Sequence, residues 1–375
     1  MNNKKFDVII VGAGPAGVGM GSVLRQLGLE NFTILERMEV GATFKMWPEE
    51  TRLLTPSFPG HGFGQLDLNA VVPATSPGYA YSSEHLTGEE YADYLKQVAG
   101  HFNLPVKTGI TVELINKEEH EDKFVVHTDK GTFESEFVIW AAGEFQYPDL
   151  YPFEGSENCL HTSKVKSWSS LEQGDYYIIG GYESGIDAAY HLVKNGYKAT
   201  VLSKGEPWND DNPDPSVSLS PFTCDRLRTI ADNKNLRLIG NAEIVKAEKD
   251  SGGFRLQLKS GSAVRTSCRP ILANGYKSSL SLVLEHFYWN ENGSVELTEK
   301  DESTVSDGLF LTGPQVKHGE VIFCFIYKFR QRFAIIAEEL CVRLGIQVDQ
   351  SVIQHYRQSS MFLDDLSCCD NSCQC

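Results

Sequence analysis

Short runs of apolar, often β-branched residues recur along this chain, and several of them end at a glycine or an acidic residue. Runs of this kind predict strands that are buried on both faces of a parallel sheet. Helical patterns follow two of them, at Val18–Leu27 and Ile186–Lys194, and alternation of strand and helix is typical of an α/β fold. The predicted strands are Phe6–Val11, Phe32–Leu35, Phe137–Gly143, the opening of Tyr176–Gly185, Lys198–Leu202, Pro270–Gly275 and Gly308–Pro314.

Three segments carry other patterns. Residues Val106–Phe137 alternate between apolar and polar positions, which predicts antiparallel strands joined by turns. Residues Glu84–Phe102 place apolar side chains three and four apart, which predicts a helix that Ser83 would cap. Residues Val321–Leu344 are predicted to form one long helix.

The first strand leads directly into a glycine-rich turn. Gly12 permits the tight turn from strand to helix, Gly14 lets the backbone approach a pyrophosphate, and Gly17 lets the helix lie close to the strand. The strand Phe32–Leu35 then ends at Glu36, 19 residues after Gly17, where an acid is expected to accept a hydrogen bond from a ribose hydroxyl. The pattern therefore predicts a dinucleotide site.

The same design returns later in the chain. Gly180 lies 168 residues after Gly12, and Gly185 matches Gly17. Tyr182, however, stands where the first turn has a glycine, so a side chain would crowd the pyrophosphate. The strand that follows ends at Ser203 and Lys204, and a hydroxyl with an ammonium suits a 2′-phosphate. This second unit favours NADPH over NADH.

Two nucleotide-binding units in one chain predict a fold of two doubly wound Rossmann-like domains, the second inserted in the first. Residues 1–164 would form the first part of one dinucleotide-binding domain, with an insertion at 43–105. Residues 165–278 would form the second dinucleotide-binding domain, and 279–345 would complete the first. Residues 346–375 would be a cysteine-rich tail.

Composition narrows the range of partners. The 375 residues carry a formal net charge of −16 and 41% hydrophobic residues, as expected of a globular protein with an acidic surface. Such a surface repels phosphate backbones and anionic lipid, and no apolar run is long enough to span a bilayer. We expect a cytoplasmic protein with a small-molecule substrate and no nucleic-acid or membrane partner; a homodimer stays an open alternative.

The paired units resemble the flavoproteins that contain two dinucleotide domains. The strand end Ala141–Gly143 and the late strand end Leu311–Gly313 carry this resemblance further. Trp47 with Arg52–Pro56 is similar to the flavin-containing monooxygenases, including their CzcO-like members. Phe153–Gly155 followed by His161 is also similar, although the spacing to His161 is wider than in the monooxygenase signature. The resemblance covers about residues 5–345 and implies FAD in the first fold and NADPH in the second.

The residues assigned to the two cofactors come from the two turns, the strand ends and the similar motifs. They are Gly12, Ala13, Gly14, Pro15, Ala16, Gly17, Glu36, Arg37, Trp47, Thr55, Ala142, Gly143 and Gly313 for FAD, and Gly180, Ser184, Gly185, Ser203 and Lys204 for NADPH. No resident metal is predicted. Hydride would pass from NADPH to FAD, and a monooxygenase-like enzyme would then oxygenate a small molecule.

The last eight residues contain four of the nine cysteines, Cys368, Cys369, Cys373 and Cys375. This tail resembles the C-terminal cysteine pair of mercuric reductases. Its thiols are candidate catalytic groups for an alternative function, the reduction of a disulfide or of a soft metal ion. A third alternative is a redox or metal sensor on a degenerate flavoprotein fold. The remaining five cysteines are scattered and are expected to be small buried residues.

Overall fold

The structure is a computed structural model and describes residues 4–58, 67–118 and 123–367. The chain divides into two compact units. The first unit comprises residues 1–45, 55–144 and 278–375, and the second unit comprises 46–54 and 145–277. Residues 145–164 and 46–54 thus belong to the second unit, whereas the sequence analysis assigned them to the first domain.

The first unit is built on a sheet of strand order β3-β2-β1-β6-β5-β4, with β15 also paired to β6. Strand β6 changes partner along its length: Gly131–Ser135 pairs antiparallel with β5, and Val138–Trp140 pairs parallel with β15. The antiparallel strands predicted before Phe137 are therefore confirmed. The strands are β1 Lys4–Val11, β2 Phe32–Leu35, β3 Val106–Lys107, β4 Val112–Glu118, β5 Lys123–Thr128, β6 Gly131–Trp140 and β15 Leu309–Leu311, with a separate hairpin β16 Lys317–His318 and β17 Val321–Ile322.

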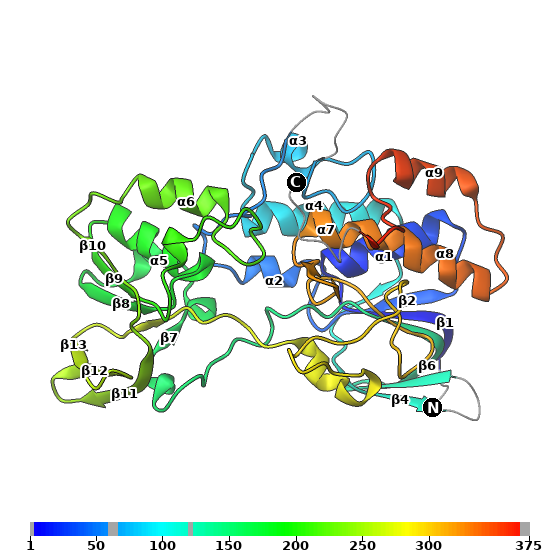
Figure 1. Ribbon diagram of the computed structural model, residues 1–375. Helices are drawn as coiled ribbons and strands as arrows, with labels where there is room; N and C mark the ends of the chain where they lie inside the picture. The colour runs from blue at the N-terminus through cyan, green and yellow to red at the C-terminus, as the bar shows by residue number, and fades with distance from the viewer. Residues whose placement is uncertain (1–3, 59–66, 119–122, 368–375) are drawn as a thin grey trace. The chain divides into compact units, whose positions relative to one another are not determined.

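Helix α1 is the central helix of this unit and packs against α4 and α8 (Figure 1). A Cβ atom added at Gly19 would lie 2.1 Å from Cε2 of Phe333, so only glycine allows α1 and α8 to approach this closely. The helices are α1 Pro15–Gln26, α2 Ala42–Lys45, α3 Pro77–Tyr81, α4 Gly88–His101, α7 Ile326–Phe329, α8 Phe333–Arg343 and α9 Gln350–Gln358, with 3-10 turns η5 Ser279–Leu282, η6 Leu284–His286 and η7 Arg330–Arg332.

Two predicted helices differ from the observed ones. The helix predicted from Glu84 with a Ser83 cap begins at Gly88, because Thr87 and Glu90 form a capping box. The Thr87 hydroxyl accepts the Glu90 N–H at 3.1 Å, and the Glu90 carboxylate accepts the Thr87 N–H at 2.8 Å. This reciprocal pair satisfies two backbone donors that a start at Glu84 would leave open.

The helix predicted over Val321–Leu344 ends as predicted, but it begins only at Ile326 and is not one continuous α-helix. Its first residues form β17, and α7 and α8 are separated by η7. Two arginines in η7 are buried and bound: Arg330 donates to the Ala70 carbonyl at 2.7 Å, and Arg332 Nε lies 2.9 Å from Asp301 Oδ2. A buried guanidinium needs such partners, and both arginines lie in the 3-10 turn that interrupts the α-helical hydrogen bonding.

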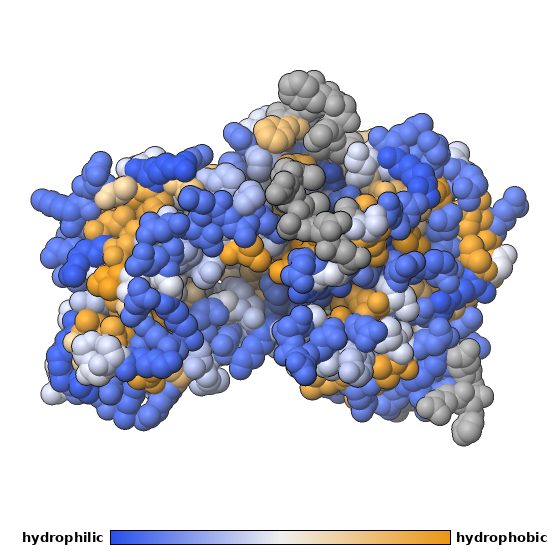
Figure 2. Space-filling model, in the orientation of Figure 1, coloured by the Kyte–Doolittle hydropathy of each residue, from blue (hydrophilic) through white to orange (hydrophobic). Residues whose placement is uncertain are grey.

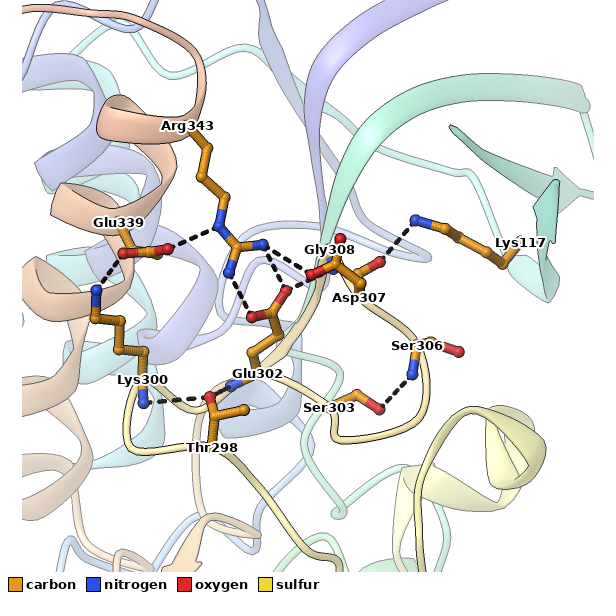
Figure 3. Close-up of polar contacts among 10 residues, drawn as sticks. All are labelled: Lys117, Thr298, Lys300, Glu302, Ser303, Ser306, Asp307, Gly308, Glu339 and Arg343. Carbon is orange, nitrogen blue, oxygen red and sulfur yellow. Dashed lines mark hydrogen bonds and ion pairs between the residues drawn. The ribbon is translucent and has the colours of Figure 1, made fainter. Parts of the chain in front are cut away.

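An ion-pair network ties α8 to the segment that leads into β15 (Figure 3). The Arg343 guanidinium reaches Glu302 at 2.6 Å, Glu339 at 2.7 Å and Asp307 at 3.1 Å. Glu302 is only 5% exposed and also accepts the Gly308 N–H at 2.6 Å. Desolvation alone would raise the pKa of Glu339, but hydrogen bonds from Lys300 and Arg343 outweigh it and hold that pKa below its ordinary value.

We expect Arg343→Met to lower the free energy of unfolding by about 2 kcal/mol, between the values for exposed and buried ion pairs. Because the pKa of Glu339 is lowered on folding, its contribution is present above the unfolded value and is lost as the pH falls through the folded value. The variant should therefore lose less stability than the wild type on acidification below pH about 5. Urea titration at several pH values measures both effects. Arg228→Met is the matched control, because the Arg228–Asp225 ion pair is exposed. This variant should change the free energy of unfolding by less than about 1 kcal/mol. Equal effects of the two variants would contradict the role given to the network.

The second unit is built on a parallel sheet of strand order β10-β9-β8-β14-β7, and α5 follows β8 through the second glycine turn (Figure 1). A separate antiparallel sheet of β11, β12 and β13 completes the unit. The elements are β7 Leu160–His161, β8 Asp175–Ile179, β9 Lys198–Leu202, β10 Leu236–Ile239, β11 Ile244–Asp250, β12 Gly253–Leu258, β13 Ala263–Thr266, β14 Ile271–Leu272, α5 Glu183–Lys194 and α6 Pro221–Arg228, with 3-10 turns η1 Ser156–Asn158, η2 Thr162–Lys164, η3 Trp168–Ser170 and η4 Pro207–Asn209.

Neighbouring residues of the parallel strands point into two different cores. Ile178 packs with residues of α5 and α6, whereas Ile179 packs with residues of β11 and β12. Val201 and Leu202 of β9 divide in the same way. Since successive side chains on a strand point to opposite faces, the sheet is covered on both sides, which explains its nearly continuous apolar strands.

No helix in the described part of the chain is long and apolar enough to cross a membrane. Hydrophilic residues cover most of the face seen in Figure 2, and hydrophobic residues appear there in scattered groups. This agrees with the acidic composition of the chain.

Candidate functional site: two nucleotide-binding turns

The glycines of the first turn are held by contacts that leave no room for a side chain at two of them. Gly12 has φ +102°, and a Cβ there would lie 2.6 Å from the Ala141 carbonyl oxygen. A Cβ at Gly17 would lie 1.9 Å from the Gly12 carbonyl oxygen, whereas one at Gly14 would meet nothing within 4 Å. The turn is therefore packed against other backbone atoms at Gly12 and Gly17, whereas the space beside Gly14 is free of protein atoms.

Glu36 lies at the end of β2 and binds the turn directly. Its Oε2 accepts the Ala13 N–H at 2.8 Å, and its Oε1 accepts the Met38 N–H at 2.7 Å. The two bonds hold the carboxylate next to the turn before any ligand arrives. A carboxylate has about four lone-pair sites, so acceptor capacity remains for a ligand hydroxyl.

The second turn repeats the geometry of the first. Gly180 has φ +113°, and a Cβ there would lie 2.1 Å from the Ala273 carbonyl oxygen. A Cβ at Gly185 would lie 2.0 Å from the Gly180 carbonyl oxygen, as at Gly17 in the first turn. Ala273 follows β14 as Ala141 follows β6, so each turn rests against the end of a neighbouring parallel strand.

The sequence pattern of the pyridine nucleotide-disulphide oxidoreductase family matches residues 9–313, which include both turns. This chain belongs to that family. As a member it is an oxidoreductase, with FAD and NAD(P)H as cofactors.

Similar proteins include the flavoproteins expected from the sequence. An uncharacterized CzcO-like oxidoreductase of Geobacillus kaustophilus is 29% identical over 206 residues, 53% of this chain and 54% of that protein. A probable indole-3-pyruvate monooxygenase of Arabidopsis thaliana, YUCCA4, is 28% identical over 341 residues, 85% of this chain and 75% of that protein. The chain spans about half the length of the CzcO-type relatives it matches, 54% in Geobacillus and 52% in Bacillus subtilis.

Among solved structures, the bacillithiol disulfide reductase Bdr of Staphylococcus aureus superposes with a TM-score of 0.74 at 21% identity, covering 91% of this chain and 99% of that one. The likeness confirms the predicted fold, two dinucleotide-binding domains of the doubly wound type. The predicted resemblance to CzcO-like flavoproteins is confirmed by the relatives above.

The residues around the first turn fit FAD. Gly313, at φ +106°, follows β15, and a Cβ there would lie 3.5 Å from Cβ of Ala16 in α1. On either side of Gly313, the Thr312 hydroxyl and the Gln315 Nε2 are buried without a hydrogen-bond partner among the described residues. Buried polar atoms are rarely left unpaired, so these two point to a polar ligand beside the turn. The sequence analysis missed both; their position next to Gly313 was the available signal.

The other assigned residues of the first turn occupy different settings. Ala13 and Ala16 are buried, Pro15 is the first residue of α1, and Arg37 is exposed. Thr55 is buried and its carbonyl accepts from Asn69 Nδ2 at 2.8 Å, while Gly143 has φ +64° beyond Ala142. Trp47 belongs to the second unit, where its ring centre lies 6.0 Å from that of Phe145. Its assignment to FAD stays a prediction.

Around the second turn, Ser184 lies in the first turn of α5 and Ser203 follows β9. Ser203 is buried, and its N–H donates to the Ile239 carbonyl at 3.0 Å. Lys204 is largely exposed and lies 3.2 Å from Glu243, which Lys259 approaches to 2.9 Å. Both ammonium groups are thus paired with the Glu243 carboxylate, and the assignment of Ser203 and Lys204 to NADPH stays a prediction.

His161 is held in a structural role. Its ring is 3% exposed, its Nε2 lies 3.1 Å from the Gly275 carbonyl, and its Nδ1 contacts Ser163. Burial lowers the pKa of His161, so the ring is neutral at physiological pH. Both ring nitrogens have partners within the second unit, which leaves neither of them available for a substrate.

The buried cysteines are poor nucleophiles. Burial raises the pKa of Cys159 to about 12 and that of Cys341 to about 11. A thiolate is the reactive form, so these two thiols are inert near neutral pH. The four predicted catalytic cysteines, Cys368, Cys369, Cys373 and Cys375, lie outside the described residues.

Proposed function

We propose that this protein uses NADPH to reduce its FAD and then oxygenates a small molecule, as a monooxygenase-like enzyme. The observation that carries the proposal is the pair of equivalent turns. In each, one glycine packs against the end of a parallel strand and a second packs against the carbonyl of the first. One turn has the acid suited to the free 2′-hydroxyl of FAD, and the other has the hydroxyl and ammonium suited to NADPH. The likeness to a monooxygenase over 85% of this chain supports the second half of the proposal.

Each residue near the turns has a definite task in this proposal. Glu36 accepts a hydrogen bond from the ribose of the adenosine, and the N–H groups at the start of α1 face the pyrophosphate. The unpaired Thr312 hydroxyl and Gln315 amide would bind the polar part of the flavin. When bound, FAD can accept a hydride from a pyridine nucleotide and pass electrons to oxygen.

The proposal is tested by mixing the FAD-loaded protein with NADPH or NADH without oxygen and following the flavin absorbance. Bleaching by NADPH is expected, and oxygen consumption should then couple to oxygenation of an added amine, thioether or ketone. No bleaching with either nucleotide would contradict the NADPH step. Oxygenation would be contradicted if the flavin bleaches but, with every substrate tested, all the oxygen that is consumed appears as hydrogen peroxide.

Reduction of a disulfide is the second candidate, because the family is named for disulphide oxidoreductases and four of the last eight residues are cysteines. In that case NADPH oxidation without oxygen should depend on an added disulfide. A variant that ends at Leu366 shows whether the tail takes part: it should keep flavin bleaching and lose disulfide reduction. Unchanged turnover in the truncated protein would remove the tail from the reaction.

Discrimination between the two nucleotides is expected to depend on Lys204. We expect Lys204→Glu to raise KM for NADPH about tenfold and leave KM for NADH unchanged, because the substituted carboxylate would repel the 2′-phosphate. The control is Lys194→Glu, which makes the same charge change at the opposite end of α5. Steady-state kinetics with both nucleotides measure the effect, and an equal change of KM for NADPH and NADH would place Lys204 away from the 2′-phosphate.

A further inference from the structure

The two glycine turns differ most in size and charge at two adjacent positions. The first has Gly14 and Pro15, whereas the second has Tyr182 and Glu183. The backbone is nearly the same, with φ −78° and ψ −169° at Gly14 and φ −85° and ψ −163° at Tyr182. The difference between the turns therefore lies in their side chains and not in their path.

The Tyr182 side chain leaves the backbone in the direction that is open in the first turn. A Cβ at Gly14 would meet nothing within 4 Å, and this open side is where a pyrophosphate approaches the backbone. Tyr182 is 53% exposed. Its backbone carbonyl accepts the Gly185 and Ile186 N–H groups at 2.9 and 3.0 Å, and these bonds leave the ring itself unused. A ring that is this exposed on the open side of the turn competes with a nucleotide for the same space.

Glu183 changes the charge of the second turn. The first turn of α1 contains no acidic residue, whereas Glu183 is the first residue of α5. Its carboxylate accepts the Ser220 N–H at 2.5 Å and the Ser220 hydroxyl at 3.2 Å, which fixes it beside the start of α5. A carboxylate there offsets the partial positive charge that a helix N-terminus offers to a phosphate.

We propose that Tyr182 and Glu183 make the second turn a weak pyrophosphate site, so that the pyridine nucleotide exchanges quickly while FAD stays bound at the first turn. The inference rests on the proposed function, because it concerns the affinity of the NADPH site. The apparent affinity of a site is proportional to the fraction of the time that the site is open. A ring that leaves the site open for about a tenth of the time would raise the dissociation constant about tenfold.

The test is titration of the FAD-loaded protein with NADP⁺ by calorimetry, in wild type, Tyr182→Gly and Tyr182→Phe. We expect Tyr182→Gly to bind NADP⁺ about tenfold more tightly, with unchanged FAD content, and Tyr182→Phe to match the wild type because it keeps the ring. Glu183→Gln should tighten binding about threefold at low salt. Comparison of the melting temperatures of Glu183→Gln and the wild type shows whether the hydrogen bonds to Ser220 are kept.

Equal or weaker binding of NADP⁺ by Tyr182→Gly would overturn the inference about Tyr182, and unchanged binding by a folded Glu183→Gln would overturn the part given to Glu183. If NADPH still bleaches the wild-type flavin in those cases, only the inference fails. If NADPH does not bleach it and NADP⁺ binds no variant, the proposed function fails as well.

Discussion

We expect Gly17→Ala to yield a destabilised protein that retains no FAD. The added Cβ would lie 1.9 Å from the Gly12 carbonyl oxygen, and real Cβ contacts do not come this close. Both groups belong to the backbone of one turn, so relief requires α1 to move away from β1. Overpacking of this kind costs about 3 kcal/mol or more where the neighbour is rigid, and the moved helix would no longer direct its N–H groups at the pyrophosphate.

Gly14→Ala is the matched control, because it makes the same chemical change at the residue directly before α1 begins. A Cβ at Gly14 meets nothing within 4 Å, so the folded protein should melt within a few degrees of the wild type. Its added methyl group stands on the side that the pyrophosphate approaches, so FAD should bind about tenfold more weakly. Thermal melting and flavin absorbance per protein separate the two effects. A yellow Gly17→Ala protein with wild-type melting would contradict the close approach of helix and turn.

We expect Glu36→Ala to bind FAD about a hundredfold more weakly. The change removes the acceptor of the Ala13 and Met38 N–H groups and the predicted acceptor of the ribose hydroxyl. Hydrogen bonds to a charged group contribute about 1.5–3 kcal/mol each, so losing the ligand bond together with the fixed position of the turn accounts for this factor. The measurement is titration of FAD-depleted protein, followed by flavin fluorescence.

Glu39→Ala provides the control for the charge change. Glu39 lies three residues further on and contacts Lys45 and Lys96 near the surface. It should leave FAD affinity within about twofold of the wild type, because exposed ion pairs contribute little. Similar losses in the two variants would mean that Glu36 acts through net charge and not through the ribose.

Local patterns predicted most of the parallel strands and both glycine turns. The predicted strands Phe32–Leu35 and Lys198–Leu202 were observed with the same limits, because short β-branched runs between turns permit few alternatives. Helix limits were predicted less well. Ser83 and Thr87 are both good caps in isolation, and only the reciprocal bond with Glu90 decides between them.

The break in the predicted helix Val321–Leu344 could not be read from the sequence. The run is apolar enough for one helix, but Arg330 and Arg332 find partners in Ala70 and Asp301, far away in the chain. A buried charge takes whatever backbone path reaches its partner, and that path depends on long-range contacts. For the same reason, the unpaired atoms of Thr312 and Gln315 became visible only in the folded unit.

The sequence by itself determined the two strand–glycine–helix units, the acid at Glu36 and the family to which they point, because these depend on residue types at short fixed spacings. The tertiary structure decided which side of each turn is open, since that depends on the strand ends at Ala141 and Ala273. It also gave His161 a structural role, because its partner Gly275 lies more than a hundred residues away. Spacing along the chain specifies a turn, but the groups that surround the turn come from distant segments and only the packed fold brings them together.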